Sequence, residues 1–234
     1  MNNKHPLVLD RYFYLLMALL IVGGVTYGFS QTIDDRLIHA VPPRPWILYL
    51  HAAIFSGWLV FLILQAALIR THHISLHRRL GWFGVILGAT IPVVGISTAI
   101  RMDHFRMIHF PDTVSPAFLI VTLFDMVSFA IPFGLAIHWR RKPEVHRRFI
   151  LIASAALTSA AYARFPQGFI SKWFYVWVDV LIVLGAARDI VVSRRVHPVY
   201  IWTLPFLIAC QILVIWIAVT GNRVWMKIAN EILR

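Results

Sequence analysis

The sequence predicts an all-α integral membrane protein, built as a bundle of about seven transmembrane helices. Of its 234 residues, 59% are hydrophobic and only 14% are charged, whereas soluble domains carry roughly 45–50% apolar and about 25% charged residues. Apolar runs of about 20 residues, the length that crosses a hydrocarbon core of ~30 Å, recur along the chain with short connections between them. We therefore expect residues 1–234 to form a single membrane domain.

The spans follow one another in order from the N-terminus. The first run is longer than the core of a signal peptide and is expected to be a membrane anchor. The fifth has only about 15 apolar residues, and flanking arginines that reach the two interfaces would complete it. Its many alanines and serines are typical of a closely packed central helix. The expected spans are Tyr12–Phe29, Ile47–Ile69, Leu80–Ile100, Pro116–Trp139, Phe149–Ala163, Trp173–Ile190 and Val199–Thr220.

The residues after the last span have an amphipathic pattern. Between Asn222 and Arg234, the apolar residues Val224, Trp225, Ile228 and Ile232 recur at helical spacing. This spacing predicts a short helix that lies in the outer membrane interface.

Basic residues are concentrated on one side of the expected bundle. The formal net charge is +12, and the Lys and Arg residues lie mostly at the ends of apolar runs, where they contact lipid headgroups and not nucleic acid. With seven spans, the side that holds the N-terminus carries thirteen of the 22 Lys and Arg residues. The positive-inside rule then predicts a cytoplasmic N-terminus and an external C-terminus, in a bacterial inner membrane.

The single cysteine and the lack of several known catalytic motifs exclude some classes of site. The one cysteine, Cys210, lies in an apolar run. It excludes an intrachain disulfide and any site built from several cysteines, such as a zinc finger or an iron–sulfur cluster. The sequence also lacks the zinc-protease, phosphate-loop, dinucleotide and nucleophile-elbow motifs.

A His-Arg-Arg motif opens two of the expected spans. It occurs as His77-Arg78-Arg79 before the third span and as His146-Arg147-Arg148 before the fifth. The simplest interpretation is a helix start whose arginines contact lipid headgroups. A second is that the two histidines face each other and bind haem or a metal, with the arginines on the haem propionates. Recognition of acidic lipids or of a partner protein is a third.

The same motifs make the sequence similar to known membrane proteins. His51, the two His-Arg-Arg helix starts and the downstream Arg164 resemble a group of uncharacterised bacterial multi-pass membrane proteins, over about residues 51–198. That resemblance implies a helical membrane fold and no particular chemistry. Histidines at the ends of a helical core are also faintly similar to transmembrane b-type cytochromes. Those cytochromes place histidine pairs at matched depths on facing helices, and the spacing here does not give such pairs.

Polar and ionisable residues gather in the outer halves of the spans. On a helical rise of about 1.5 Å per residue, His51 lies about 6 Å below the outer boundary and Asp179 about 9 Å. Asp125 and Gln211 lie about 13 Å below it, and Arg164 is at the rim. A charge within a span costs about 2.5–3.5 kcal/mol, so such residues are candidates for function. We expect these five to converge on an outward-opening pocket, suited to a transition metal, a proton relay or an organic cation.

The outer segment after the third span is expected to act as a lid for this pocket. It carries His104 and His109, together with Asp103, Arg106 and Asp112. The two histidines are five residues apart and do not share a helix face, so they are not expected to form a local pair of metal ligands.

Three functions fit these features. The first is a protein that binds haem or a divalent transition metal and is redox active. The second is a proton-coupled transporter of a small molecule or an ion, with Asp125 and Asp179 as the titrating groups. The third is an accessory subunit of a membrane complex, in which these carboxyls are structural and are satisfied by Arg164 or by the backbone. The expected partners are the lipid bilayer and either another membrane protein or a second copy of the chain.

Overall fold

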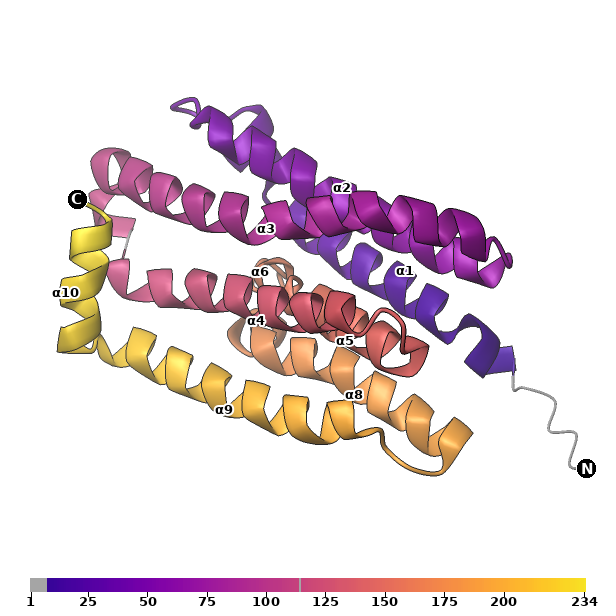
Figure 1. The fold of residues 1–234 in the computed structure, drawn as a ribbon. Helices are drawn as coiled ribbons and strands as arrows, with labels where there is room; N and C mark the ends of the chain where they lie inside the picture. The colour runs from indigo at the N-terminus through magenta and orange to yellow at the C-terminus, as the bar shows by residue number, and fades with distance from the viewer. Residues whose placement is uncertain (1–7, 114) are drawn as a thin grey trace, which may run out of the picture.

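The computed structural model describes residues 8–113 and 115–234, and these residues contain helices and no strand. Figure 1 shows the long helices lying side by side, with α10 crossing one end of the bundle near the C-terminus. This end is called the α10 end below, and the other the opposite end. The elements are α1 (Val8–Ser30), η1 (Asp34–Ile38), α2 (Trp46–Arg70), α3 (Ile74–His109), η2 (Pro111–Thr113), η3 (Pro116–Phe118), α4 (Leu119–His138), α5 (Pro143–Ala156), α6 (Ser159–Tyr162), α7 (Gly168–Lys172), α8 (Phe174–Ser193), α9 (Pro198–Thr220) and α10 (Arg223–Ile232).

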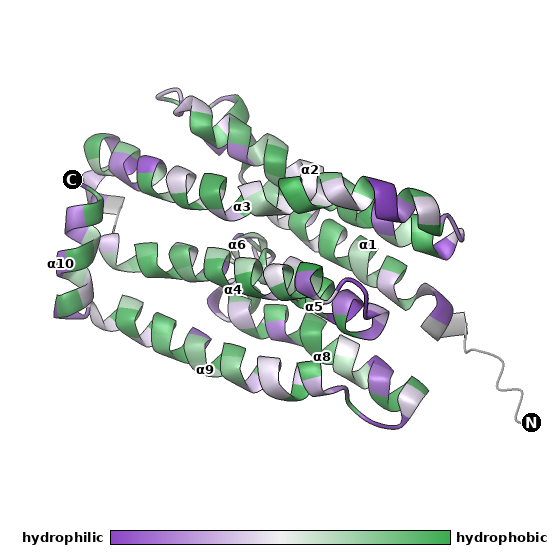
Figure 2. Ribbon diagram, viewed as in Figure 1, coloured by the Kyte–Doolittle hydropathy of each residue, from purple (hydrophilic) through white to green (hydrophobic). Residues whose placement is uncertain are grey.

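Five of these segments are long and apolar enough to cross a membrane. They correspond to the first four expected spans and the last, and the all-α fold class is confirmed. Figure 2 shows hydrophobic residues along the length of the long helices, with hydrophilic residues more frequent near their ends. The five segments are Arg11–Ser30, Trp46–Arg70, Ile74–His109, Pro116–His138 and Pro198–Thr220.

The fifth and sixth expected spans differ from the other five. α8 has 20 residues but carries Asp179, Arg188 and Asp189, which lower its apolar character. The fifth, expected as one helix over Phe149–Ala163, is divided into α5 and α6. The division lies at Thr158, whose hydroxyl donates a hydrogen bond of 2.6 Å to the carbonyl oxygen of Ala155. The backbone N–H of Thr158 also donates to the carbonyl oxygen of Ala155, three residues back, so the α-helical pattern of hydrogen bonds is interrupted there.

α3 is longer than expected at both ends. It has 36 residues, about 54 Å at 1.5 Å per residue, and so exceeds a ~30 Å hydrocarbon core. His104 and His109, expected in a loop, lie on its last turns.

The core is densest around α5 and α4. Every residue of α5 from Arg148 to Ala156 is buried except Ile150. The neighbouring α4 contributes Phe129, which is 0% exposed and packs edge-on against the ring of Trp58 from α2. By contrast, Phe206 on α9 is 69% exposed. Large exposed apolar side chains along the long helices are compatible with contact to a lipid bilayer.

α10 covers the end of the bundle. Asn222 Oδ1 caps it by accepting hydrogen bonds from the backbone N–H groups of Val224 and Trp225. The indole Nε1 of Trp225 donates a hydrogen bond of 2.9 Å to the carbonyl oxygen of Ala117, and Ala229 is buried. Val224 is 68% exposed. The predicted short helix is therefore present, with one face on the bundle and an apolar strip outside.

Candidate functional site

A buried carboxyl lies inside the bundle, on α4. Asp125 Oδ2 accepts a hydrogen bond of 2.6 Å from Ser159 Oγ of α6, and its Oδ1 accepts one of 2.9 Å from the hydroxyl of Tyr175 of α8. Asp125 is 8% exposed and Ser159 is 1% exposed. Three helices therefore meet at one carboxyl whose hydrogen-bond partners are both neutral hydroxyls.

A second carboxyl lies one turn further along α8. Asp179 Oδ1 accepts a hydrogen bond of 3.1 Å from Nε2 of Gln211 on α9, and Gln211 is buried. Because residues four apart share a helix face, Asp179 lies on the same face of α8 as Tyr175. Asp125, Ser159, Tyr175, Asp179 and Gln211 form the set that is called the central polar layer below.

The central polar layer contains three of the five residues that the sequence predicts to converge. Asp125 belongs to it through its hydrogen bond with Tyr175 of α8, and Gln211 through its hydrogen bond with Asp179 of the same helix. Sequence reasoning missed Tyr175, since a tyrosine near the start of a span is typical of an interfacial belt. Its four-residue spacing from Asp179 is the signal that points to it.

His51 and Arg164 lie apart from this layer. The His51 ring stacks on Phe55 with ring centroids 3.9 Å apart, and its Nδ1 is buried without a hydrogen-bond partner. Arg164 lies over the ring of Phe29, and its Nη1 donates to the carbonyl oxygen of Ala160. The charge of Arg164 acts electrostatically on His51. These two residues form a separate group at the edge of the bundle and do not hydrogen-bond to either carboxyl of the central polar layer.

The histidines expected in a lid bind backbone carbonyls. His104 Nδ1 lies 3.2 Å from the carbonyl oxygen of Leu233, and His109 Nδ1 lies 2.9 Å from that of Phe105. Asp103 forms an ion pair with Arg106. Among the described residues, neither histidine bonds to a side chain of the central polar layer. His104 instead connects α3 with the residue that follows α10, and His109 binds the backbone of its own helix.

The two His-Arg-Arg motifs have different surroundings. Arg78 and Arg79 are exposed, as expected of headgroup contacts. Arg148 was predicted to contact headgroups too, but its side chain is 3% exposed and binds the fully buried Asp189. Its Nε lies 2.8 Å from Oδ2 and its Nη2 lies 2.5 Å from Oδ1 of that carboxylate. Arg148 therefore stabilises the bundle by a bidentate ion pair between α5 and α8.

Further charges surround this ion pair at the opposite end. Arg188 Nη1 lies 3.0 Å from Asp189 Oδ1, and Glu144 Oε2 lies 2.8 Å from Arg148 Nη1 and 2.5 Å from Arg147 Nη2. Burial raises the pKa of Glu144, but the hydrogen bond from Arg148 and the neighbouring arginine charges outweigh it and leave that pKa below its ordinary value. Arg147 also lies over the ring of Tyr14. The Arg147 side chain, which the sequence predicts to contact lipid headgroups, thus also contacts Glu144 and Tyr14 of the protein.

The two histidines of the motifs lie within electrostatic range of each other. His77 Nδ1 is buried without a hydrogen-bond partner, as are both amide atoms of Gln65. His146 Nδ1 lies 2.9 Å from the carbonyl oxygen of Ala136, which leaves its Nε2 free. Within residues 8–113 and 115–234, no group of three or more His, Cys, Asp or Glu side chains is arranged to hold a metal ion.

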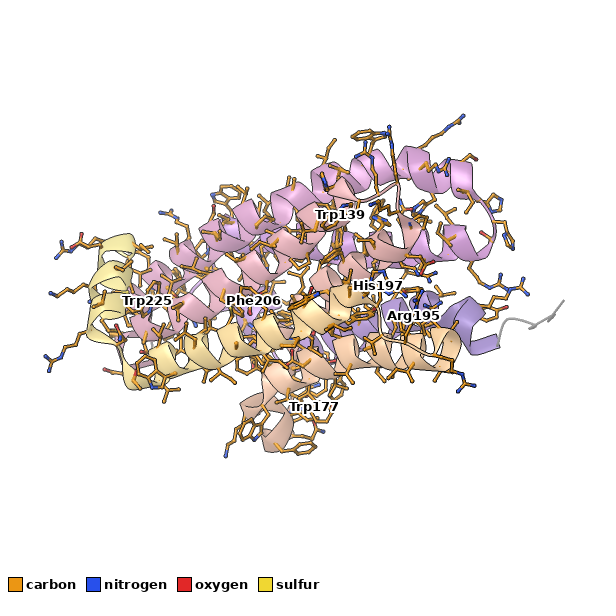
Figure 3. All side chains as sticks on the ribbon, turned by 60° about the horizontal axis from the view of Figure 1, so that its bottom comes forward. Trp139, Trp177, Arg195, His197, Phe206 and Trp225 are labelled. Atoms are coloured by element: carbon orange, nitrogen blue, oxygen red, sulfur yellow. The ribbon has the colours of Figure 1, made fainter. Side chains whose placement is uncertain are left out.

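Two shallow surface hollows lie away from the central polar layer. One is next to α10, lined by Arg223, Val224, Lys227 and Ile228. The other is near the opposite end, where α4, α5 and α9 meet, and includes Trp139 and Trp202 among its lining residues. Figure 3 shows Trp139, Arg195 and His197 towards that end and Trp225 at the α10 end, with Phe206 between them. Tryptophans thus lie near both ends, as in proteins with two interfacial belts.

Comparison with known proteins finds no matching family model, no matching curated protein and no matching solved structure.

Proposed function

We propose that the chain crosses a bacterial inner membrane seven times, with its N-terminus in the cytoplasm. A helical segment is present in each of the seven expected ranges. The charged residues that set α8 apart from the other long helices are bonded inside the bundle, because Asp179 binds Gln211 and Asp189 binds Arg148. Those carboxylates therefore need not face lipid, which removes the main objection to α8 as a span.

We propose that the protein is a proton-coupled transporter of a small molecule or an ion, and that Asp125 is its proton-binding group. The observation that carries this proposal is the pair of hydroxyls, from Ser159 and Tyr175, that bind a buried carboxyl to which no cation of the described residues is paired. A structural carboxylate in a bundle is normally fixed in its charged form by an arginine or a lysine. Asp189, bound by Arg148 in the same protein, is of that kind.

Hydroxyl partners suit a group that gains and loses a proton. A hydroxyl both donates and accepts hydrogen bonds. When Asp125 is ionised, it accepts from both Ser159 and Tyr175. When it is protonated, it donates to one hydroxyl and accepts from the other. The carboxyl therefore has two hydrogen bonds in either state, so a change of protonation does not cost a hydrogen bond at Asp125 itself.

Proton flux into vesicles tests this proposal. The protein is reconstituted into liposomes that enclose a pH-sensitive dye, and a pH gradient is imposed with and without succinate or inorganic phosphate outside. We expect flux above that of protein-free vesicles, lost in Asp125→Asn and reduced in Tyr175→Phe. The control is Ser128→Ala, since Ser128 lies on the same helix, is buried and has no hydrogen-bond partner. Equal flux in wild type and Asp125→Asn would overturn the proposal.

A second candidate function is binding of haem or a single metal ion between His77 and His146. It is favoured by their proximity, by the unpartnered Nδ1 of His77 and by the backbone hydrogen bond that leaves His146 Nε2 free. A histidine that ligates a metal commonly binds a carbonyl through its other nitrogen. An optical spectrum and metal analysis of gently purified protein test this idea. If the purified protein shows no haem absorption band and contains no stoichiometric metal, the idea is excluded.

A further inference from the structure

Arg164 is a partly buried cation that has no acidic partner within residues 8–113 and 115–234. In the described part of the chain, the only hydrogen bond of its guanidinium runs from Nη1 to the carbonyl oxygen of Ala160, in the preceding turn. Its Nε is buried and has no partner. A guanidinium carries five N–H donors, so most of its donor capacity is unused.

The neighbours of Arg164 increase the positive charge instead of balancing it. Arg36, in η1, and Arg106, near the end of α3, both act on it electrostatically. Burial, followed by these two charges, lowers the pKa of Arg164 to about 10. Arg106 already has a partner in Asp103. Arg36 follows Asp34 and Asp35 in η1, whereas the described residues contain no carboxylate that forms an ion pair with Arg164, so the charge of Arg164 is not compensated by the protein.

His51 adds a second unused polar atom to this group. Its Nδ1 is buried and has no partner, and it lies within the field of Arg164. Arg164 is also five residues along the chain from Ser159, which binds the carboxyl of Asp125. Arg164 thus follows a residue of the central polar layer closely in the chain, although among the described residues it makes no hydrogen bond to either carboxyl of that layer.

We propose that Arg164, with His51 beside it, binds an anionic oxygen group of the carboxylate or phosphate class. Resting on the proposed transport function, we further infer that this anion is the substrate that moves with the proton at Asp125. Guanidinium is well suited to this role because its fork of donors matches the oxygens of a carboxylate or a phosphate. An anion would use the free N–H groups and compensate the excess positive charge.

The test is calorimetric binding of succinate and of inorganic phosphate to protein in phosphatidylcholine nanodiscs. We expect Arg164→Gln to weaken binding at least about tenfold, the loss expected for a hydrogen bond to a charged group. Arg164→Lys, which keeps the charge, is expected to bind more tightly than Arg164→Gln. The matched control is Arg101→Gln, because Arg101 is an exposed arginine on α3 and its removal should leave binding unchanged.

A further variant keeps the test valid if Arg164→Gln folds poorly. Arg36 is exposed, so Arg36→Gln should fold normally, and the loss of its charge is expected to weaken anion binding about two- to threefold. Nanodiscs that contain phosphatidylglycerol distinguish a lipid headgroup from a soluble anion. If this lipid suppresses succinate and phosphate binding to the wild type, the site takes a headgroup phosphate, and if not, it takes the soluble anion.

The proposal is overturned if the wild type binds succinate and phosphate no more tightly than Arg164→Gln, with and without phosphatidylglycerol. Failure of the transport function is a separate result. Anion binding that depends on Arg164, together with proton flux that is unchanged in Asp125→Asn, would retain the site and reject proton coupling.

Discussion

Replacement of Asp189 by asparagine is expected to destabilise the folded bundle strongly. Asp189 is fully buried, and its carboxylate accepts hydrogen bonds from Arg148 Nε and Nη2, from Arg188 Nη1 and from the backbone N–H of His197. The Asp189→Asn side chain has nearly the same shape but no charge. Two buried arginines then lose their buried carboxylate partner, and Arg148 keeps only the ion pair with Glu144, whose side chain is 58% exposed.

The magnitude follows from the burial of this pair. Removal of one partner of a buried ion pair typically costs about 3–5 kcal/mol, which is roughly a 150- to 5,000-fold change in the unfolding equilibrium. The matched control is Arg147→Gln, in the same end of the bundle. Its ion pair with Glu144 has side chains that are 32% and 58% exposed, and exposed pairs contribute only about 0–1 kcal/mol.

The assay is unfolding of the purified protein in detergent micelles, followed by circular dichroism as dodecyl sulfate is added. Asp189→Asn is expected to unfold at a much lower denaturant fraction than either wild type or Arg147→Gln. The double variant Arg148→Met/Asp189→Leu should recover part of the loss, because an apolar pair of similar volume often replaces a buried ion pair without penalty. A loss in Asp189→Asn no larger than that in Arg147→Gln would refute the reasoning.

Three further predictions concern packing, pH and helix capping. A Cβ on Gly28 would collide with a backbone carbonyl of α6, whereas one on Gly23 would meet nothing within 4 Å. Gly28→Ala should therefore cost about 1–3 kcal/mol of unfolding free energy, and a loss as small as that of Gly23→Ala would contradict this packing. The pKa of Glu144 is lowered in the folded state from its ordinary value of 4.5. Its stabilising contribution should thus be complete above about pH 4.5 and be lost as the pH falls below it. Unfolding measured from neutral to acidic pH should show a weaker acid dependence in Glu144→Gln, and identical profiles would disprove the linkage. Because Asn222 caps α10, Asn222→Ala should cost about 1 kcal/mol and speed amide hydrogen exchange in that helix. Asn230→Ala should not, and equal exchange in the two variants would count against the cap.

The long helices could be predicted from the sequence because their apolar runs have about the length that crosses the hydrocarbon core of a bilayer. The division of the fifth range could not, since it depends on a local change in the backbone hydrogen bonds at Thr158. An apolar run carries no information about such a local change. The greater length of α3 was missed for a related reason. Its last turns, up to His109, are polar and look like a loop when they are judged by hydropathy alone.

The site was predicted in part. Depth along each span brings Asp125, Asp179 and Gln211 to similar levels, and packing of their helices brings them into the central polar layer. The fate of a His-Arg-Arg arginine could not be predicted in this way. Arg148 is buried and Arg78 is exposed because only Arg148 has a carboxylate facing it, from Asp189, a residue 41 positions further along the chain.

Infrared spectroscopy of the carboxyl groups tests the central claim most directly, since it observes protonation of Asp125 itself. Reconstituted wild-type protein is compared with Asp125→Asn and, as an exposed control, with Asp34→Asn. We predict a carboxylic-acid C=O band of a buried group whose intensity changes with pH in the wild type and in Asp34→Asn, and which is absent from Asp125→Asn. Identical pH-dependent spectra of the wild type and Asp125→Asn would contradict the claim that Asp125 binds the proton.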